Sequence, residues 1–410
     1  MADFSFLHMA DLHLGSPFRG LSVSEPAVAR RFSQAIRDTF CALVARAIRE
    51  EVDFVVIAGD VYDGEWRDAS VGLFLNRELA RLAEAGVPVY LVKGNHDAAS
   101  VVTRSVTLPK GVHTFGVGKP STLALPHLKV ALHGQSYRER EAPDNLARDY
   151  PEARAGHFNI GVLHTSLSGY EGHAPYAPCS QGDLVAKGYD YWALGHIHAP
   201  QVVRGSAPAI VYPGCIQGRS VRETGPRGAM HVRVAGGEVS LEPWVADQAR
   251  WCVAEVDASR VADFHAEVPP LVEAAVREAV ADAGDRLVAL RVRLAGATAA
   301  HDWMAAHAAD VRMEVEAAAQ RVSPDVWLEK VRLATTSDAP PLAPDLGEFD
   351  LAGLLREAAA DERFAAQVEG DLATLLAKLP TEGRDGFDGD HETLLADAQA
   401  LLATRIGRAQ

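Results

Sequence analysis

The chain has 410 residues, of which 48% are hydrophobic and 23% are charged. These values are typical of globular proteins and exclude a disordered chain, a collagen-like chain and a small disulfide-stabilised protein. Because domains of about 150 residues are usual, the length predicts two or three domains. The formal net charge of −15 argues against a protein that holds nucleic acid through a broad basic surface.

The cysteines and the apolar runs predict the compartment. Cys41, Cys179, Cys215 and Cys252 are widely spaced and form no CxxC pair, so neither a disulfide framework nor a zinc knuckle is indicated. Residues 1–15 do not resemble a secretory signal, and no run of about 18 apolar residues occurs. We therefore expect a cytoplasmic protein that does not enter a membrane.

The first half of the chain predicts an α/β domain, because short apolar runs alternate with amphipathic stretches. We expect strands at 4–9, 53–58, 87–92, 129–133, 159–163, 191–194 and 209–212, and helices at 30–50 and 73–85. Residues 230–234 and 238–244 flank Gly236 and Gly237 and predict a hairpin. This hairpin is expected to close a first domain, residues 1–248.

The composition becomes richer in alanine after Arg250, and the order of elements changes. We expect strands at 251–256, 287–294 and 327–333 and helices at 271–283 and 301–321, which together make a small α+β domain over residues 249–336. A proline-containing linker then leads to a tail, residues 337–410, with helical patches at 351–360, 364–379 and 392–406.

The tail is acidic, with a net charge of −8 over residues 341–410 from fourteen acidic and six basic side chains. It is therefore not expected to contact DNA. Its leucines recur at helical spacing, which is typical of a surface that packs on other helices. We expect the tail either to bind a partner protein or to dock on the second domain.

Polar residues follow five of the predicted strands where each strand ends. They are Asp11, His13, Asp60, Asp63, Asn95, His96, His164, His196 and His198. The carboxyl ends of parallel strands meet at one edge of a sheet, where α/β proteins build their sites. A single D-x-H or H-x-H pair is common in turns and caps, but this ordered recurrence beside glycines favours a metal site.

Seven of these residues are candidate metal ligands: Asp11, His13, Asp60, Asn95, His164, His196 and His198. Carboxylate, amide and imidazole donors without a thiolate suit Mn²⁺, Fe²⁺ or Zn²⁺. Seven donors exceed the needs of one tetrahedral ion. The sequence therefore predicts two divalent ions, with Asp60 as the carboxylate that they share.

The series D-x-H, GD-x-x-D, GNHD, a strand-end His and GH-x-H resembles that of the calcineurin-like metallophosphoesterases. The segments FLHMADLHLG, AGDVYD, VKGNHD, LHTS, DYWALGHIH and YPGCIQGR are similar to the SbcD nuclease-subunit family, including its YhaO-like branch. The resemblance implies a four-layer α-β-β-α sandwich with a smaller α+β capping domain and a helical C-terminal tail.

The resemblance also implies a role for each residue of the site. One ion would be held by Asp11, His13, Asp60 and His198, and the other by Asp60, Asn95, His164 and His196. His96 would contact the phosphate and protonate the leaving 3′ oxygen. Asp63 would orient His96, although some relatives carry a histidine at that position.

The function implied is that of a Mn²⁺-dependent DNA repair nuclease with 3′ to 5′ exonuclease and single-strand endonuclease activity. It would work as a homodimer with an SMC-like ATPase of the SbcC type. A small-molecule phosphodiesterase on the same scaffold is the second hypothesis. A non-catalytic scaffold subunit is the third, and the complete set of ligands argues against it.

Arginines gather in residues 204–233, which contain five arginines and a single acid, for a net charge of +4. Of these, Arg204, Arg219 and Arg222 are candidates for contact with DNA phosphates, because the segment directly follows the GH-x-H motif. A solvated loop is the alternative. Because the tail is acidic, we expect contact with DNA to be confined to two places, the sheet edge that carries the candidate metal ligands and residues 204–233.

Overall fold

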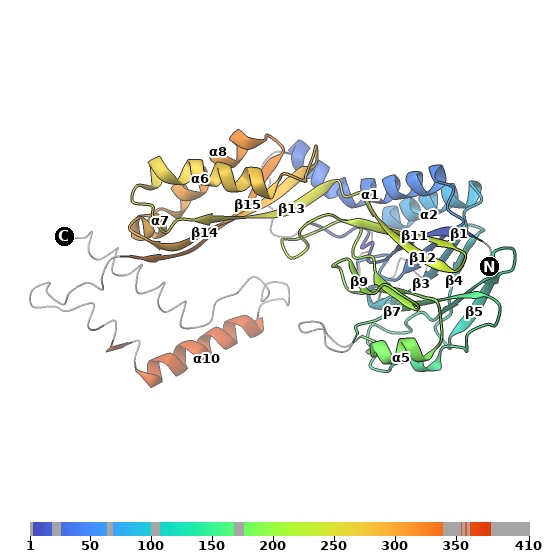
Figure 1. The fold of residues 1–410 in the computed structure, drawn as a ribbon. Helices are drawn as coiled ribbons and strands as arrows, with labels where there is room; N and C mark the ends of the chain where they lie inside the picture. The colour runs from blue at the N-terminus through green and yellow to red at the C-terminus, as the bar shows by residue number, and fades with distance from the viewer. Residues whose placement is uncertain are drawn as a thin grey trace, which may run out of the picture. The chain divides into compact units, whose positions relative to one another are not determined.

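The computed structural model describes residues 3–18, 26–63, 69–99, 107–167, 176–338 and 361–378, together with Leu354, Glu357 and Ala358. The chain divides into two compact units (Figure 1). One unit comprises Met1–Cys252 with Asp282–Leu290, and the other comprises Val253–Ala281 with Arg291–Gln410. Among the described residues, no helix combines the length and apolar character that a membrane crossing needs.

The first unit contains two six-stranded sheets. In one, the parallel strands β1 (Phe4–Met9), β2 (Phe54–Ala58), β3 (Val89–Val92) and β4 (Val112–Thr114) lie side by side. The hairpin of β11 (Gly228–Ala235) and β12 (Glu238–Val245) joins this sheet antiparallel to β1. The predicted hairpin is therefore confirmed.

The other sheet has the order β5-β6-β7-β8-β10-β9. Its parallel centre consists of β6 (Val130–Gly134), β7 (Phe158–His164), β8 (Tyr191–Gly195) and β10 (Ala209–Tyr212). The antiparallel edges are β5 (Ser121–Leu125) and β9 (Gln201–Arg204). The sequence analysis missed β4, β5 and β9, because these strands are short and partly exposed and lack a continuous apolar run.

A shared core joins the inner faces of the two sheets. Alternate residues of β1 and β2, such as Phe6 and Phe54, point inward, and their rings stack at 4.9 Å. Tyr191 of the opposite sheet meets Phe6 edge-on at 5.3 Å. Because helices cover the outer faces, both sides of these strands are buried, which explains their continuous apolar sequence.

Helices form the two outer layers of the first unit. The long helices α1 (Pro26–Arg49) and α2 (Ala69–Glu84) pack on the outer face of the β1 sheet through a separate core (Figure 1). On the other side, η1 (Leu146–Asp149) and α5 (Gln181–Ala186) cover the outer face of the β7 sheet around Trp192. The predicted four-layer α-β-β-α arrangement is confirmed.

The second unit is built on a three-stranded sheet of order β13-β14-β15, from strands β13 (Ala249–Asp257), β14 (Leu287–Thr298) and β15 (Val326–Ser337). Helices α6 (Phe264–Ala279), α7 (His301–Ala306) and α8 (Ala308–Val322) connect them. In α6 the residues Val268, Val272 and Val276 are buried at helical spacing. The expected α+β character of this region is therefore present.

Two helix predictions in the second unit differ from the structure, one in its bounds and the other in its continuity. The helix expected from residue 271 begins at Phe264, because the Asp263 side chain accepts hydrogen bonds from the backbone N–H groups of His265 and Ala266. Pro269 and Pro270, which favour a later start, lie inside the helix. The helix expected over 301–321 is interrupted at His307, whose φ of −122° and ψ of 44° are not helical.

Only part of the tail falls within the described residues. The helix α10 (Glu362–Lys378) covers most of the predicted patch at 364–379. The patch at 351–360, apart from three of its residues, and the patch at 392–406 lie outside the described residues.

Candidate metal centre

The seven predicted donor residues lie at the carboxyl ends of five strands of the first unit. Asp11 and His13 follow β1, Asp60 follows β2, Asn95 begins the short helix α3 (Asn95–Ala99) after β3, His164 ends β7, and His196 and His198 follow β8. Contacts between the sheets bring these ends together. The Nδ1 atom of His164 lies 2.9 Å from the Ala58 carbonyl oxygen, and the backbone N–H of His196 donates to the Asp11 carboxylate at 3.0 Å.

The backbone at four of the donors is in the left-handed region. The φ angles are 50° at Asp11, 44° at His13, 52° at Asp60 and 102° at His196. Such conformations cost about 1 to 3 kcal/mol each in non-glycine residues and persist where the surrounding structure enforces them, often at functional sites. The strain supports a functional role for this edge.

Glycines beside the donors allow the strand ends to approach closely. A Cβ atom on Gly59 would lie 2.5 Å from His164 Nδ1, and one on Gly94 would lie 2.8 Å from the backbone nitrogen of Asp60. Any other residue at either position would push two donor segments apart. This explains why glycine adjoins the motifs.

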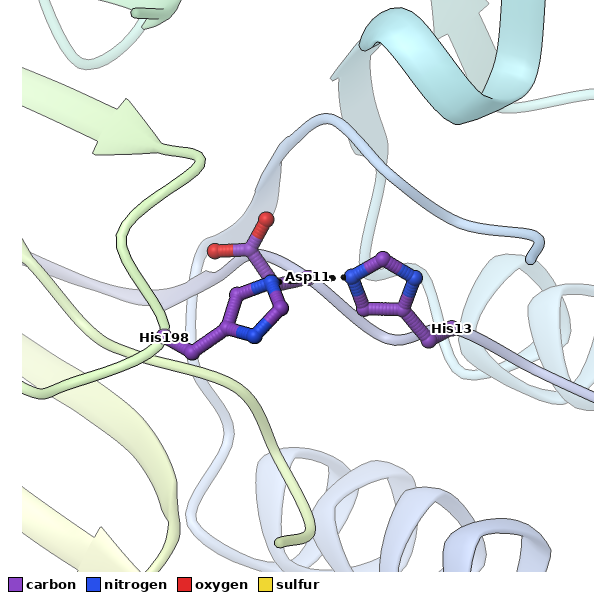
Figure 2. A group of neighbouring side chains, drawn as sticks. All are labelled: Asp11, His13 and His198. Atoms are coloured by element: carbon purple, nitrogen blue, oxygen red, sulfur yellow. Dashed lines mark hydrogen bonds between the residues drawn. The ribbon is translucent and has the colours of Figure 1, made fainter. Parts of the chain in front are cut away.

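One group of donors is formed by Asp11, His13 and His198, which point toward one another in Figure 2. One ligand atom from each lies within 4.8 Å of the others. The Nε2 atoms of the two histidines are 3.1 Å apart. Two imidazole nitrogens that face each other beside a buried carboxylate fit the requirements of a divalent cation.

A second group is formed by Asp60, His164 and His196. The Oδ2 atom of Asp60 lies 3.4 Å from Nε2 of His164 and 3.9 Å from Nε2 of His13. The Asn95 side-chain oxygen adds a further donor, 2.9 Å from His164 Nε2. Asp60 therefore lies between the two groups, where a carboxylate shared by two ions would have to lie.

Burial and crowding shift the pKa values of these groups. Burial lowers the pKa of His164, but the charge of Asp60 outweighs this effect and raises it to about 9. Burial raises the pKa of Asp60, but His164 reverses the direction and holds it well below its usual range. Burial raises the pKa of Asp11. A bound divalent cation would neutralise the negative charge of these buried carboxylates in place of a proton.

His96 and Asp63 adjoin the donors. The Nδ1 atom of His96 lies 3.3 Å from Oδ1 of Asp63, and 28% of the His96 side chain is exposed. The backbone N–H of His96 donates to Asp60 at 3.0 Å. Burial lowers the pKa of His96, but the hydrogen bond to Asp63 and the nearby carboxylates outweigh it and raise the pKa. His96 is thus a solvent-accessible imidazole that holds its proton firmly.

Asp97 joins the loops that carry these residues. Its carboxylate accepts hydrogen bonds from the backbone N–H groups of Val61 at 3.2 Å, Tyr62 at 3.0 Å and Gly94 at 3.0 Å. Burial, together with the charge of Asp60, raises its pKa to about 6. Asp97 fixes the loop after β2 to the loop after β3.

Of the three candidate DNA-binding arginines, the structure brings Arg219 to the donors. Its NH2 atom lies 3.2 Å from Nδ1 of His198. Arg204 instead donates to the carbonyl oxygens of Ser206 and Ala207 in its own loop, at 3.3 and 3.1 Å. Arg222 is exposed. The roles of these arginines on DNA remain predictions.

The sequence analysis missed two residues that contact the donors. Oε1 of Glu223 lies 2.6 Å from Nδ1 of His198, and the Tyr137 hydroxyl donates to the backbone carbonyl of His164 at 2.7 Å. Glu223 could have been noticed, because it is the only acid in the arginine-rich segment and follows Arg219 by four residues. Tyr137 lies outside every motif and gave no signal.

Comparison with protein-family models matches both halves of this architecture. Residues 4–200, which carry all the candidate ligands, match the calcineurin-like phosphoesterases. The chain carries a calcineurin-like phosphoesterase domain. Residues 251–336, which follow this phosphoesterase domain, match the middle domain of the metallophosphoesterase YhaO.

Two relatives and one solved structure are similar to this chain. The uncharacterized metallophosphoesterase YhaO of Bacillus subtilis is 38% identical over 269 residues, which are 65% of this chain and 66% of the relative. The DNA double-strand break repair protein Mre11 of Sulfurisphaera tokodaii is 31% identical over 215 residues, 49% of this chain and 51% of that protein. A dimetal phosphatase from Danio rerio aligns with a TM-score of 0.35 and 14% identity, over 59% of this chain and 99% of that one.

The chain thus spans slightly less than two thirds of YhaO and about half of this Mre11. The matches support the YhaO-like part of the predicted resemblance. Membership of the SbcD family itself remains a prediction.

Proposed function

We propose that the chain is a two-metal DNA nuclease that hydrolyses phosphodiester bonds in DNA repair. The observation that carries the proposal is the gathering of seven donors at one sheet edge, where Asp60 lies between the group of Asp11, His13 and His198 and the donors on its other side. The similarity to a DNA double-strand break repair protein supports DNA as the substrate.

The residues present fit two divalent ions, with Asp11, His13 and His198 around one, His164, His196 and Asn95 around the other, and Asp60 between them. Bound there, the ions would activate water and neutralise charge on the phosphoryl oxygens. We propose Mn²⁺, as the resemblance to the nuclease family implies; the carboxylate and amide oxygens suit this ion, while the imidazoles also suit Fe²⁺ or Zn²⁺.

His96 would act on the leaving group. Its Nδ1 atom faces Asp63, which accepts a hydrogen bond from that side of the ring. The proton on Nε2 is then available to the 3′ oxygen that leaves when the phosphodiester bond breaks. Although burial opposes it, the hydrogen bond to Asp63 and the nearby carboxylates raise the pKa of His96 above its ordinary value, which favours the protonated ring.

We further propose a homodimer, a cytoplasmic location and an SMC-like ATPase of the SbcC type as partner. Support for a protein partner comes from the acidic tail, whose helix α10 exposes the apolar side chains Phe364 and Leu375. An acidic helix with exposed apolar residues suits a protein surface better than DNA.

The test is a cleavage assay with Mn²⁺ on linear duplex DNA, single-stranded DNA and bis-p-nitrophenyl phosphate. His96→Ala should lower DNA cleavage by about 10²- to 10⁴-fold, the usual worth of a general acid. Asp60→Ala should abolish it. His127→Ala, which removes an exposed histidine outside the site, is the matched control and should keep full activity.

If the wild-type chain cleaves only bis-p-nitrophenyl phosphate, the nuclease proposal is wrong and the small-molecule phosphodiesterase hypothesis is supported. Full DNA cleavage by His96→Ala would refute the role of His96. No cleavage of any substrate by the wild-type chain with bound Mn²⁺ would favour the non-catalytic scaffold.

A further inference from the structure

In three candidate histidine ligands, His13, His164 and His198, the Nδ1 atom faces a different group. The Nδ1 atom of His164 lies 2.9 Å from a backbone carbonyl, that of Ala58. The Nδ1 atom of His13 lies 3.6 Å from Asp63, which is too far for a hydrogen bond. The Nδ1 atom of His198 instead lies 2.6 Å from a carboxylate oxygen of Glu223.

Glu223 is buried and firmly held. Its side chain is only 9% exposed, and Arg219 contacts both carboxylate oxygens, through NH2 at 3.0 Å and through its backbone N–H at 2.6 Å. Both of its oxygens face donors of Arg219, so Glu223 is a carboxylate that is paired with a cation and accepts hydrogen bonds.

The same loop holds the backbone of His198. Arg227 donates through NH1 to the His198 carbonyl oxygen and through NH2, at 2.7 Å, to that of Thr224. Gly218 closes the loop, since a Cβ atom there would lie 2.5 Å from the Glu223 carbonyl oxygen. His198 is thus fixed at both its ring and its backbone by one segment, residues 218–227.

Two groups of opposite preference face Nδ1 of His198, the acceptor Glu223 at 2.6 Å and the donor NH2 of Arg219 at 3.2 Å. The shorter contact, with the carboxylate, favours the proton on Nδ1 and the lone pair on Nε2, the atom that faces His13 at 3.1 Å. A carboxylate partner also makes an imidazole a stronger ligand, because its negative charge increases electron density on the ring.

We propose that Glu223, held by Arg219, is a positioning residue that makes the group of Asp11, His13 and His198 the tighter of the two metal sites. The proposal rests on the two-metal centre proposed above and adds an order of loading, in which this group fills first. It also assigns Arg219 a task within the protein, because its guanidinium contacts Glu223 and the Ser16 hydroxyl, the latter at 3.3 Å.

Calorimetric titration of the full chain with Mn²⁺ tests the proposal. The wild type should show two classes of site. Glu223→Gln should weaken the tighter class by about 10- to 100-fold, the usual effect of removing such a partner, and leave the weaker class within about twofold. Glu242→Gln is the matched control, because its carboxylate pairs with a buried histidine outside the cluster, His231, at 3.2 Å.

Two further measurements guard against a variant that merely misfolds. The double variant Arg219→Gln/Glu223→Gln removes both charges of the buried pair and should show the same weakened class. In the metal-free wild type labelled with ¹⁵N-histidine, the His198 resonances, assigned with His198→Asn, should show the proton on Nδ1.

Unchanged Mn²⁺ affinity in a folded Glu223→Gln protein, or a proton on Nε2 of His198 in the wild type, would overturn this inference and leave the proposed function intact. A wild-type chain that binds no divalent ion would overturn both.

Discussion

Single residues decide how closely the two sheets meet at the metal edge. Asp11, His13 and Asp60 have left-handed backbone directly after their strands, where the two segments continue side by side through hydrogen bonds such as His13 N–H to the Asp60 carbonyl at 3.0 Å. The donors therefore sit on strained backbone close to the ends of the strands. A change in a residue that orients a donor should alter chemistry before it alters folding.

Asp63→Asn is such a change. The amide that replaces the carboxylate can still fill the space but cannot hold the charged ring of His96, whose Nδ1 lies 3.3 Å away. We expect turnover of DNA to fall by about 10- to 100-fold, while Mn²⁺ affinity changes by a few-fold at most. Steady-state kinetics and metal titration measure the two effects. Asp149→Asn, at an exposed position, is the control.

Gly161→Ala tests the packing beneath the site. Gly161 pairs with Trp192 on the neighbouring strand, and a Cβ atom there would lie 2.7 Å from Cδ2 of that fully buried ring. The mutation should lower the free energy of unfolding by about 1 to 3 kcal/mol through overpacking, as measured by urea denaturation.

Gly182→Ala serves as the comparison, because its Cβ would lie 3.5 Å from Ser180 Oγ, an ordinary contact within α5. It should be neutral or slightly stabilising. Equal destabilisation by both mutations would contradict the packing argument.

At the level of elements, a buried ion pair joins the start of β13 to the segment before β14. Asp247 accepts two hydrogen bonds from Arg250, at 2.8 and 2.9 Å, and one from Arg286 at 3.1 Å, with its side chain fully buried. All three residues belong to the first unit. Asp247 is thus the single anion between two arginines.

Asp247→Ala should destabilise the first unit by about 3 to 5 kcal/mol, because it leaves two cations without their buried partner. The exposed neighbour Asp285 provides the control: Asp285→Asn should change the free energy of unfolding by less than about 0.5 kcal/mol. A small effect of Asp247→Ala in thermal and urea unfolding would show that water replaces the lost pair.

The sequence predicted the central strands well, and the reason is physical. Strands such as β2, buried on both faces, must be apolar throughout, so the run from Phe54 to Ala58 is unambiguous. Edge strands such as β9 carry no such constraint and were missed. The start of α6 was predicted seven residues too late, at 271 instead of Phe264, because the cap supplied by Asp263 was not recognised.

The site residues show the same difference between apolar strands, which the sequence predicts well, and other segments, which it does not. Asp11, Asp60 and His164 were found because each ends an apolar strand, so position along the chain determines position in space. Glu223 was not found, because it reaches His198 through the fold of a loop, and no local pattern encodes that contact. Site residues at the ends of strands can therefore be recognised from the sequence, whereas site residues on loops can be recognised only from the structure.

For the molecule as a whole, the metal centre should contribute to stability. Without an ion, the buried carboxylates at this edge are costly: burial raises the pKa of Asp11 and of Asp97, and the charge of Asp60 acts on both in the same direction. At a Mn²⁺ concentration 100 times the dissociation constant, binding to the folded state should add about 2.7 kcal/mol. Thermal unfolding with Mn²⁺ and with EDTA measures the difference.

Asp60→Ala should remove most of that stabilisation by Mn²⁺, while Asp149→Asn should retain it. A wild-type chain whose unfolding temperature is the same with Mn²⁺ and with EDTA would contradict the assignment of this edge as a metal centre.

The chain passes between its two units three times, since residues 282–290 return to the first unit before β14 continues into the second. A protease that cuts after Cys252 would therefore leave on the C-terminal fragment a segment that the N-terminal fragment needs for its own packing. The two fragments should elute together under native conditions and separate only in detergent. A chain truncated at that point would likewise lack residues 282–290, which belong to the first unit.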